Sequence, residues 1–365
     1  AKELTGLENP KSTAQLKSWI EDTAGIEVES LNKKSIAGVR ADADCDAVDR
    51  MLDIRAGLAK TSTEKYNAML RTACPDGRIR GLTQFYGAAR TGRWAGRLVQ
   101  MQNLPQNKMP DRDLDTARQL VEAGDLETLE MLFDDISGTL SKLIRTAFIP
   151  RPGYRFIVSD FSAIEARVIA WLASEEWRME VFKTHGKIYE ASASQMFGVP
   201  LELIKKGRPE YALRQKGKVA ELALGYQGST GALITMGALD MGLTEEELPD
   251  IVSRWREANK RIRDLWYSMD NAAVQVITQG GSVGINGLLL AREYDYDNGT
   301  DCLTIRLPSG RKLYYISPGI GQNEWGRPSI SYMGMDQKTK RWKRIETYGG
   351  KLVENCVQAI ARDCL

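Results

Sequence analysis

Histidine and cysteine are scarce in this chain of 365 residues, which contains one histidine, His185, and five cysteines. The cysteines are odd in number and lie apart with no CxxC pair, which argues against a disulfide framework and against a zinc site. With a single histidine, a mechanism that needs a histidine pair or a His-Asp-Glu cluster is incomplete within this sequence. Scattered thiols of this kind favour a reducing cytoplasm.

Long hydrophobic runs are absent as well. No apolar stretch approaches the ~18 residues that a membrane-spanning helix needs, and the N-terminal AKELTGLENPKS does not have the layout of a signal peptide. The apolar fraction of 42% and the charged fraction of 27% are ordinary for a globular protein. The sequence therefore predicts no membrane association, and a chain long enough for two or three subdomains.

Basic residues are unevenly distributed, although the net charge is only +2. Two segments concentrate them: Arg78, Arg80, Arg90, Arg93 and Arg97 in the first, and Lys205, Lys206, Arg208, Arg214, Lys216 and Lys218 in the second. Cations that cluster among Gln, Asn and aromatic residues are typical of surfaces that bind nucleic acid or nucleotide phosphates. On clustering alone, two solvated basic faces are an equally good interpretation.

Periodicity and turn residues divide the chain into helical and strand-rich segments. Helical spacing occurs in residues 1–75, 114–148, 163–275 and 351–365. Strand and loop are predicted for residues 80–108, and a short apolar strand for YRFIVSD, residues 154–160. From residue 280 the hairpin turns and β-branched runs predict an antiparallel sheet. Together these segments predict an α+β fold, one sheet domain with helical lobes.

Two acids stand close together in IVSDFSAIEARVIAWLA, where Asp160 ends the predicted strand and Glu165 falls in the helical pattern. An acid at the end of a strand can bind a divalent cation, because Mg²⁺ prefers one or two carboxylates together with substrate phosphates. The alternative for Asp160 is an acid that interacts with the helix dipole. For Glu165 taken alone, the S-A-I-E spacing favours a capping box with Ser162 as the N-cap.

A second element, RPEYALRQKGKVAELALGYQGS, carries Arg214, Lys218, Leu222 and Tyr226 four residues apart. On a helix this spacing drifts only about 40° per step, so the four side chains form one stripe. Two cations could bind a polyphosphate, the aliphatic residue could cover a sugar, and Tyr226 could stack near a base. Gly217 and Gly225 would weaken the helix but would allow close packing. The alternative is an ordinary amphipathic surface helix.

A third element, GAARTGRWAGRLVQMQNLPQ, surrounds Arg93 with small residues and adds Gln102 and Asn103. These side chains donate hydrogen bonds, and bases present acceptors in the minor groove, so donors there can check pair geometry without reading sequence. An ordinary Gly-rich loop is the alternative interpretation.

These three elements, in this order, resemble motifs of family A DNA polymerases. DFSAIEAR is similar to motif A, whose pattern is D-Y-S-x-I-E-x-R, and RQKGKVAELALGYQG is similar to motif B, R-x3-K-x3-[FY]-x3-Y-G. ARTGRWAGRLVQMQNLP resembles the upstream T-G-R-L-S…N-L-Q-N-I-P signature. RAGLAKTST resembles the tip of the thumb helix, and TYGGKLVENCVQAIARD resembles the helix before motif C in the form usual for phage enzymes. The resemblance covers nearly the whole chain.

The resemblance implies a right-hand polymerase fold with a thumb, a palm that contains an antiparallel sheet, and helical fingers. Its implied boundaries are a thumb-like helical region at 1–75, a first part of the palm with motif A at 76–180, fingers with motif B at 181–270, and a second, incomplete part of the palm at 271–365.

The resemblance also implies roles for individual residues. Asp160 would bind both catalytic metal ions, with the Phe161 carbonyl assisting one, and Lys218 would act as an acid toward the leaving pyrophosphate. Glu165 would exclude a ribose 2′-hydroxyl, and Tyr226 would lie at the templating position. The implied dNTP-binding residues are Ser162, Ala163, Ile164, Glu165, Tyr189, Arg214, Lys218, Leu222 and Tyr226. The implied DNA-binding residues are Lys60, Thr63, Arg93, Gln102, Asn103 and Gln358.

The chain also departs from the family pattern. Leu222 stands where the family has Phe or Tyr, which leaves sugar discrimination open; Gln227 replaces a Gly, and Tyr189 stands where cellular relatives often carry a phosphate-binding His. Motif C, the H-D-E that supplies the second metal carboxylate, is absent. Asp295 and Asp297 of EYDYDNG are predicted to be solvated turn residues rather than metal ligands.

The leading hypothesis is therefore template-directed DNA synthesis on primer–template DNA with dNTPs, using two Mg²⁺ ions that Mn²⁺ can replace. The second palm carboxylate would come from a further C-terminal segment or from a second polypeptide. The alternative is a catalytically incomplete polymerase fragment that binds primer–template DNA. A ribonucleotide-using polymerase or primase is disfavoured by Glu165. A phage enzyme of this type would act in the cytoplasm of a bacterial host.

Overall fold

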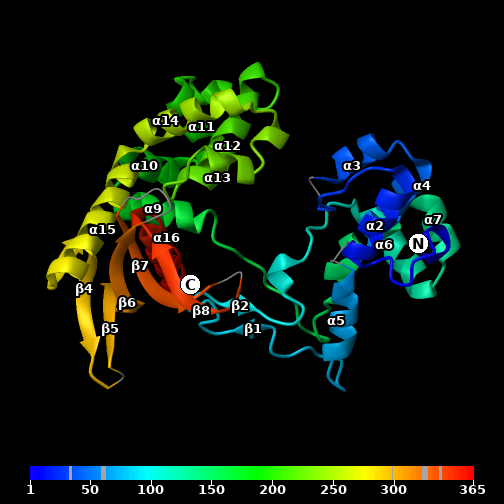
Figure 1. Cartoon of the computed structure of the whole chain (residues 1–365), viewed down its shortest axis with the longest axis horizontal. Coiled ribbons are helices and arrows are strands. Elements are labelled where there is room, and N and C mark those ends of the chain that lie inside the picture. The colour runs from blue at the N-terminus through cyan, green and yellow to red at the C-terminus, as the bar shows by residue number, and fades with distance from the viewer. Residues whose placement is uncertain (33–34, 59–62, 298, 323–327, 337–338) are drawn as a thin grey trace. The chain divides into compact units, whose positions relative to one another are not determined.

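The computed structural model describes residues 1–365 apart from 33–34, 59–62, 298, 323–327 and 337–338. The chain folds into two compact units, whose elements are labelled in Figure 1. The first unit comprises Ala1–Gln84 and Gly96–Ile157, and the second comprises Phe85–Ala95 and Val158–Leu365. The short segment Phe85–Ala95 of the second unit lies along the chain between two two-residue strands, β1 (Thr83–Gln84) before it and β2 (Ala95–Gly96) at its end.

The first unit is built from helices, as the sequence predicts. They are α1 (Lys2–Thr5), α2 (Thr13–Ala24), α3 (Ile36–Ala43), α4 (Asp46–Leu58), α5 (Glu64–Thr72), α6 (Asp111–Ala123), α7 (Leu126–Leu132) and α8 (Ile136–Leu143), with 3₁₀ turns η1 (Met101–Asn103) and η2 (Ile144–Ala147). Leu16 and Ile20 of α2 pack with Val48, Met51 and Leu52 of α4 in a common core. Apolar residues three or four positions apart give each helix one buried face.

The predicted helical stretch 114–148 is interrupted twice. Asp125 accepts a hydrogen bond from the Thr128 backbone N–H at 3.0 Å, and Asp135 accepts one from Gly138 at 2.8 Å. Each aspartate is the N-cap of a new helix, α7 and α8, because its carboxylate satisfies a backbone donor that the first turn leaves free. The helical prediction for this stretch is confirmed, as three helices.

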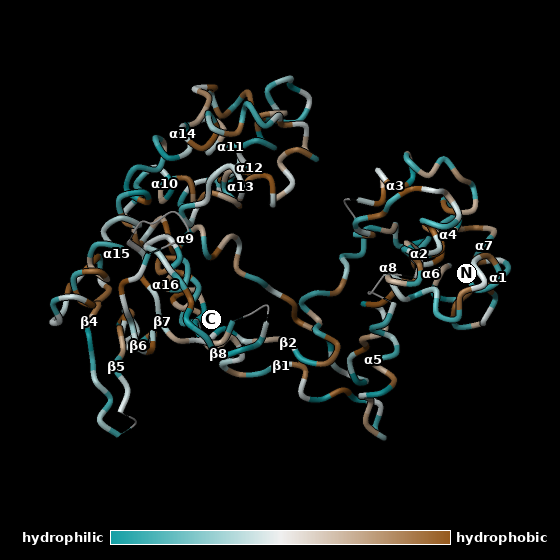
Figure 2. Tube along the Cα trace, viewed as in Figure 1, coloured by the Kyte–Doolittle hydropathy of each residue, from teal (hydrophilic) through white to brown (hydrophobic). Residues whose placement is uncertain are grey.

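The second unit contains the long helical run predicted for residues 163–275. Its helices are α9 (Ile164–Ala173), α10 (Glu176–Thr184), α11 (Ile188–Phe197), α12 (Leu213–Leu224), α13 (Thr230–Thr235), α14 (Leu248–Ala258), α15 (Lys260–Gln279) and α16 (Gly349–Asp363), with 3₁₀ turns η3 (Leu201–Leu203), η4 (Pro209–Ala212), η5 (Leu239–Met241) and η6 (Glu245–Glu247). The rings of Trp255 and Trp266 stack within this core, with their centres 5.9 Å apart. Hydrophobic and hydrophilic residues alternate along these helices (Figure 2), and the hydrophobic ones supply that core.

An antiparallel sheet of six strands follows α15, as predicted from residue 280. Its strands are β3 (Ser282–Ile285), β4 (Leu288–Asp295), β5 (Thr300–Arg306), β6 (Lys312–Gln322), β7 (Pro328–Met335) and β8 (Trp342–Thr347). Each strand pairs with the next one along the chain. Helix α15 packs along β3 to β6, and Asn355 of α16 donates a hydrogen bond to the Tyr315 hydroxyl at 3.0 Å. The sheet and the two helices therefore share one core.

The apolar strand predicted for residues 154–160 is wrong. The structure has no strand there, and the side chains are exposed, 85% for Ile157 and 91% for Val158. A strand is stable only when a neighbouring strand takes up its backbone hydrogen bonds. In the described part of the chain no strand pairs with this segment. The apolar run alone therefore did not determine the local structure.

Among the described residues, no helix combines the length and the hydropathy that a membrane span requires.

Candidate active site

Glu165 is the centre of the candidate site, but it is not the cap that its local sequence predicts. Helix α9 begins at Ile164, with Ala163 as its N-cap, and no side chain caps the helix. The Glu165 carboxylate instead accepts a hydrogen bond from Arg93 Nη1 at 2.8 Å on Oε1 and a longer one from the Tyr226 hydroxyl at 3.4 Å on Oε2. The predicted capping box with Ser162 is therefore wrong, because an ion pair to a distant arginine takes the carboxylate away from the helix start.

The ion pair between Arg93 and Glu165 is partly open to solvent, with side-chain exposures of 49% and 33%. Tyr226 is more enclosed. Burial raises the pKa of Tyr226 far above its ordinary value, and the nearby Glu165 carboxylate adds to this effect. The phenol therefore keeps its proton at neutral pH and acts as the donor to Glu165. Three of the predicted site residues meet at this carboxylate.

Tyr226 lies just beyond the end of α12, and the start of α16 packs tightly against it. A Cβ at Gly350 would lie 2.6 Å from the Tyr226 carbonyl oxygen, so no larger residue fits there without a shift. Gln227 has a φ of 66°, in the left-handed region that favours glycine. Its side-chain oxygen accepts a hydrogen bond from the Gly350 N–H at 2.9 Å. This hydrogen bond helps to stabilise Gln227 in the left-handed conformation at the position where the family pattern has Gly.

The predicted stripe on α12 is confirmed for Arg214, Lys218 and Leu222, which the helix places one turn apart. Arg214 Nε donates to Glu190 at 2.8 Å, and this hydrogen bond raises the pKa of Arg214. The Arg214 guanidinium also lies 5.4 Å from the centre of the Tyr189 ring. Lys218 has no hydrogen-bond or ion-pair partner in the described part of the chain. Leu222 is 49% exposed.

Gly217 allows α12 and α11 to approach closely, as its sequence position suggested. A Cβ on Gly217 would lie 2.2 Å from the Tyr189 carbonyl oxygen and 3.0 Å from the Ala193 backbone nitrogen. Gly225 has no such role, since the nearest atom to its Cβ position is 3.8 Å away. Pro209 starts the η4 turn that leads into α12, a position where proline is favoured because its missing N–H is not needed there.

A buried ion pair behind the stripe was missed by the sequence reasoning. Arg178 of α10 donates to both carboxylate oxygens of Glu221, and their side chains are 2% and 4% exposed. Glu221 also accepts from Trp255 Nε1 at 3.0 Å, and Arg178 donates to the Asn259 side-chain oxygen at 2.9 Å. Both helices carry several charged residues, so nothing in the local sequence singled out this pair. The network fixes α12 against α10 and α14.

Asp160 and Phe161 lie in the irregular segment before α9. Asp160 is exposed and Phe161 is 48% exposed. The backbone after them is held by Arg167, whose Nε donates to the Ser162 carbonyl at 2.8 Å. No group of three or more His, Cys, Asp or Glu residues able to hold a metal ion occurs among the residues that the structure describes.

The predicted DNA-binding residues are divided between the two units. Gln102 and Asn103 form the η1 turn of the first unit, where the Asn103 side chain donates to Gln100 at 3.1 Å. Thr63 directly precedes α5, also in the first unit. Gln358 lies on α16 in the second unit and donates to Glu354 at 3.3 Å. Lys60 lies outside the described residues.

Asp295 and Asp297 lie at the turn between β4 and β5. The Asp297 N–H donates to the Asp295 carboxylate at 3.0 Å, which is ordinary turn chemistry. This contact supports their interpretation as turn residues.

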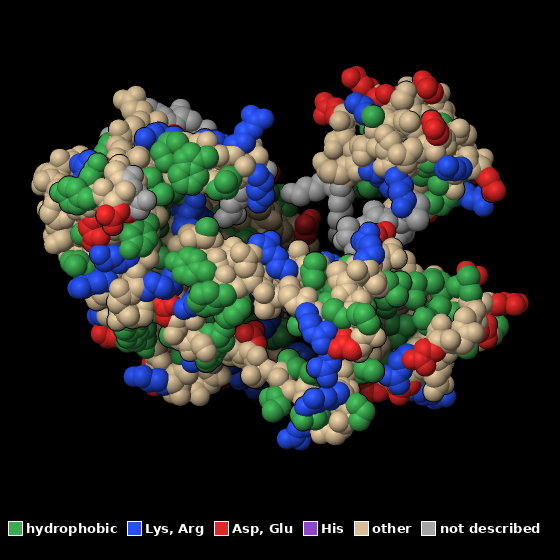
Figure 3. All heavy atoms as spheres, turned by 90° about the horizontal axis from the view of Figure 1, so that it is seen from below, with side chains coloured by type: hydrophobic (Ala, Val, Ile, Leu, Met, Phe, Trp, Pro, Cys, Tyr) green, Lys and Arg blue, Asp and Glu red, His purple; other side chains and the backbone are tan. Residues whose placement is uncertain are grey.

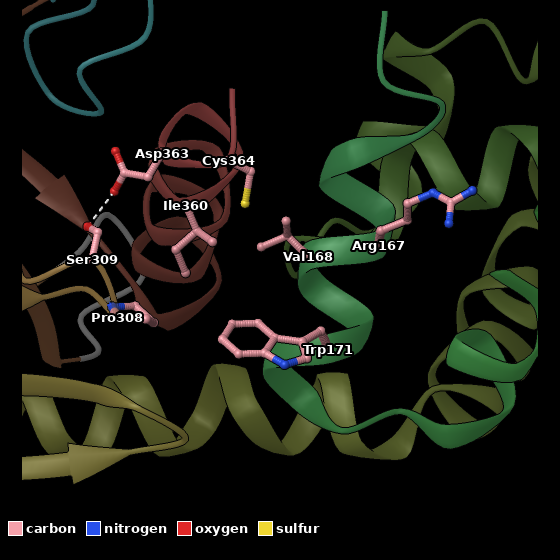
Figure 4. Close-up of a pocket in the computed structure, with 8 residues that line it drawn as sticks. All are labelled: Arg167, Val168, Trp171, Pro308, Ser309, Ile360, Asp363 and Cys364. Carbon is pink, nitrogen blue, oxygen red and sulfur yellow. Dashed lines mark hydrogen bonds between the residues drawn. The ribbon is translucent and has the colours of Figure 1, made fainter. Parts of the chain in front are cut away.

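A pocket of about 400 Å³ lies between α9, α16 and the turn between β5 and β6 (Figure 4). Its lining comprises Arg167, Val168, Trp171, Pro308, Ser309, Ile360, Asp363 and Cys364. Val168, Trp171 and Ile360 point toward one another, whereas Asp363 accepts a hydrogen bond from Ser309 at 2.7 Å (Figure 4). None of the predicted site residues lines this largely apolar pocket.

Comparison with known proteins agrees with this architecture. The family model described as "DNA polymerase family A" matches residues 1–281, and the chain belongs to this family. More particularly, the chain is 57% identical over 367 residues to the DNA polymerase of Bacillus phage SP02. That match covers 100% of this chain and 55% of the phage protein, so the chain spans about half the length of this relative.

More distant relatives match in part. DNA polymerase I of Rhizobium leguminosarum is 34% identical over 121 residues, which is 33% of this chain and 11% of that protein. Among solved structures, the POL domain of Pol1 from M. smegmatis, described as a complex with DNA primer-template and dNTP, matches with a TM-score of 0.52. The match has 18% sequence identity and covers 99% of this chain and 48% of that one. The predicted α+β polymerase fold is thereby confirmed.

Proposed function

We propose that this chain takes part in template-directed DNA synthesis, the transfer of a nucleotidyl group from a dNTP to the 3′-hydroxyl of a primer. The observation that carries the proposal is the meeting of three sequence motifs at one carboxylate. Arg93 from the upstream signature and Tyr226 from motif B both donate to Glu165 of motif A. The name of the phage relative, DNA polymerase, supports the same activity.

The stripe on α12 would hold the dNTP triphosphate. Arg214 and Lys218 present cations one helical turn apart, and such charge-assisted hydrogen bonds to phosphate are strong. Lys218, which has no ion-pair partner among the residues that the structure describes, would protonate the leaving pyrophosphate. Tyr189 lies beside Arg214 and would contact the phosphates through its hydroxyl, where relatives use a histidine.

The sugar and the base would lie between the stripe and the start of α9. Ser162, Ala163 and Ile164 would line this space with backbone and small side chains. Glu165 would exclude a 2′-hydroxyl, and its ion pair with Arg93 fixes the carboxylate for that purpose. Leu222 supplies an exposed aliphatic surface for the sugar, and Tyr226 would lie at the templating base.

On the DNA side, Arg93, Gln102, Asn103 and Gln358 would contact the primer and the template strand. Lys60 and Thr63, next to α5, would contact the duplex further upstream. All of these side chains are donors or cations, which is what minor-groove and phosphate contacts require.

Two Mg²⁺ ions, replaceable by Mn²⁺, would activate the primer hydroxyl and neutralise the pyrophosphate. The residues present fit this requirement in part. Asp160 offers an exposed carboxylate and Phe161 a neighbouring carbonyl, which are oxygen ligands of the kind Mg²⁺ prefers. Among the residues that the structure describes, no group of three or more His, Cys, Asp or Glu residues could hold a metal ion.

We further propose that the second carboxylate comes from a C-terminal segment beyond these residues or from a second polypeptide. The relative of Bacillus phage SP02 is longer than this chain, which covers 55% of it. Ile157 and Val158 are apolar yet almost fully exposed, and so present a surface that another strand could cover.

In the right-hand description, we assign residues 1–75 to the thumb, 76–180 to the first part of the palm, 181–270 to the fingers and 271–365 to the second part of the palm. The boundary between the compact units at Ile157 and Val158 falls inside the first palm segment. We also propose that the protein acts in the cytoplasm of a bacterial host, as its similarity to a phage polymerase suggests.

The test is Mg²⁺-dependent primer extension by the 365-residue chain, compared with an Asp160→Ala variant. Extension by the chain supplied with the proposed C-terminal segment or second polypeptide, abolished by this variant and kept by an Asp297→Asn control, is the expected result for a polymerase. Extension by the 365 residues alone would support DNA synthesis but contradict the proposed origin of the second carboxylate. Primer–template binding without extension, equal in wild type and the Asp160→Ala variant, would favour the alternative of a catalytically incomplete DNA-binding fragment. Extension with rNTPs as fast as with dNTPs would contradict the proposed role of Glu165.

A further inference from the structure

The sheet β3–β8 begins at Ser282, directly after residue 281, where the match to the family model ends. One face of the sheet carries buried residues such as Leu303, Leu313 and Tyr315, and α15 packs along its strands. Successive residues of a strand point to opposite faces. The residues between them along each strand therefore point to the opposite face of the sheet, the outer face, which is not part of this core.

An exposed row of large side chains crosses three strands of this outer face. Tyr314 of β6, Met335 of β7 and Trp342 of β8 are 57%, 50% and 54% exposed. Met335 of β7 pairs with Trp342 of β8. On the other side of β7, Met333 pairs with Ile316 of β6. Met335 and Tyr314 each lie two residues along their own strand from this pair, so they share its face. Because side chains alternate, the three point to one side. Large apolar side chains that gather exposed on one face of a sheet are typical of an interaction surface.

Cations flank the row on both sides. Arg306 and Lys312 are paired across β5 and β6 on one side, and Arg344 is paired with Met333 on the other. Lys340 and Arg341 directly precede Trp342 and are exposed.

Few acids balance these cations. Glu293 pairs with Lys312 at 2.8 Å, and Asp336 pairs with Lys343 at 3.0 Å. Arg306, Lys340 and Arg341 have no ion-pair partner within the described ranges, and Arg344 donates to Ser331 Oγ at 3.1 Å and to no acid there. Glu346 is the remaining acid on this face of β8. The charge around the row is therefore complementary to a polyanion.

We propose that the outer face of β6–β8 binds single-stranded nucleic acid. Bases of a single strand expose their faces and can stack on Tyr314 and Trp342, and the flanking cations can contact the phosphates. In a duplex the base faces are stacked on one another and are not available to such a row. A protein partner would also cover apolar side chains, but the excess of unpaired cations favours the nucleic acid.

The hairpin between β4 and β5 provides an internal comparison. Its Tyr294 and Tyr296 are 52% and 88% exposed, with ring centres 4.9 Å apart. They stand among acids, since Asp295 lies between them and Asp297 follows. The same sheet thus presents one exposed aromatic pair among cations and another among carboxylates, and the second should repel phosphates. Figure 3 shows exposed hydrophobic side chains interspersed with Lys and Arg on one face of the molecule.

The test measures binding of a fluorescently labelled oligo-dT to the full chain by anisotropy. An excess of unlabelled hairpin primer–template occupies the proposed polymerase site, so that binding there does not contribute. The variants are Tyr314→Ala with Trp342→Ala, and Tyr294→Ala with Tyr296→Ala as the matched control. We expect the first pair to weaken binding at least about ten-fold, since stacking on one aromatic side chain accounts for roughly five-fold or more. The control should leave binding unchanged.

Three further results decide the proposal. Binding should weaken steeply with added salt, and Trp342→Phe should retain most of the affinity because it keeps a stacking ring. Ultraviolet crosslinking should attach the oligonucleotide to the peptide that contains Trp342. The proposal is wrong if oligo-dT does not bind, if the two double variants lose the same amount of oligo-dT affinity, or if the Tyr314/Trp342 variant binds like wild type. Primer–template binding is measured in the same variants as a separate readout. Its loss or retention tests the proposed polymerase site and does not test the single-strand site.

Discussion

Helix α12 presents two sets of side chains whose surroundings differ. Arg214, Lys218 and Leu222 remain partly open, and Lys218 has no partner within the described residues. On the other side, Gly217 lies against α11 and Glu221 is buried in an ion pair with Arg178. One set anchors the helix, and the other stays partly exposed, with Arg214 paired to Glu190.

If the open set binds a ligand as proposed, the buried set behind it would serve as a rigid support. Glu221 lies between Lys218 and Leu222 in the sequence, and its bonds to Arg178 and Trp255 fix the rotation of α12. A ligand that meets already oriented cations loses less entropy on binding. Changes to the buried set should therefore reduce stability, and changes to the open set should reduce ligand binding without affecting stability.

The largest effect is expected from Glu221→Ala. This change leaves the Arg178 guanidinium buried without its carboxylate, and breaking a buried pair by removal of one partner costs about 3–5 kcal/mol. The free energy of unfolding, followed by tryptophan fluorescence in a denaturant titration, measures it.

Glu247→Ala is the matched control for that change, because Glu247 also pairs with a cation of α12, Lys216 at 2.7 Å, but this pair is partly exposed, at 40% for Glu247 and 28% for Lys216. The control should change stability much less. Equal losses in the two variants would show that the buried pair is not an anchor.

A smaller effect is expected from Lys218→Ala, which removes an unpaired cation of the open set. If the ammonium contacts a triphosphate, its loss should weaken dNTP binding to the chain on primer–template by about ten-fold or more, the size of a charge-assisted hydrogen bond. The unfolding midpoint should not move. Lys216→Ala is the control on the same helix, and its dNTP affinity should match wild type. Equal affinity in both variants would remove Lys218 from the site.

The open set could be predicted from sequence because its information is local. Arg214, Lys218 and Leu222 recur with the period of one helix, and the helix formed where that period indicated. The helical run of the second unit and the hairpin sheet after residue 280 were predictable for the same reason, since turn residues and periodicity lie within each segment.

The anchoring contacts could not be predicted because their partners are remote. Arg178 and Glu221 are 43 residues apart, and Arg93 and Glu165 are 72 apart. The capping box at Glu165 was a sound local interpretation, but a charged partner from another segment displaced it. The strand at 154–160 was wrong for a related reason, because its apolar residues indicate burial only if a second strand is present to cover them.

The smallest effect, Gly217→Ala, tests the close approach of α11 and α12. The added Cβ would lie 2.2 Å from the Tyr189 carbonyl, a backbone atom that moves only if α11 shifts. Overpacking of this kind costs about 1–3 kcal/mol, partly offset because alanine favours the helix over glycine. Gly225→Ala, where the nearest atom is 3.8 Å away, should lose no stability.

The Gly217→Ala variant should also weaken dNTP binding, because Tyr189 lies beside Arg214. This variant therefore tests the buried and the open set of α12 together. If Gly217→Ala is as stable as wild type, the anchoring of α12 does not depend on this contact.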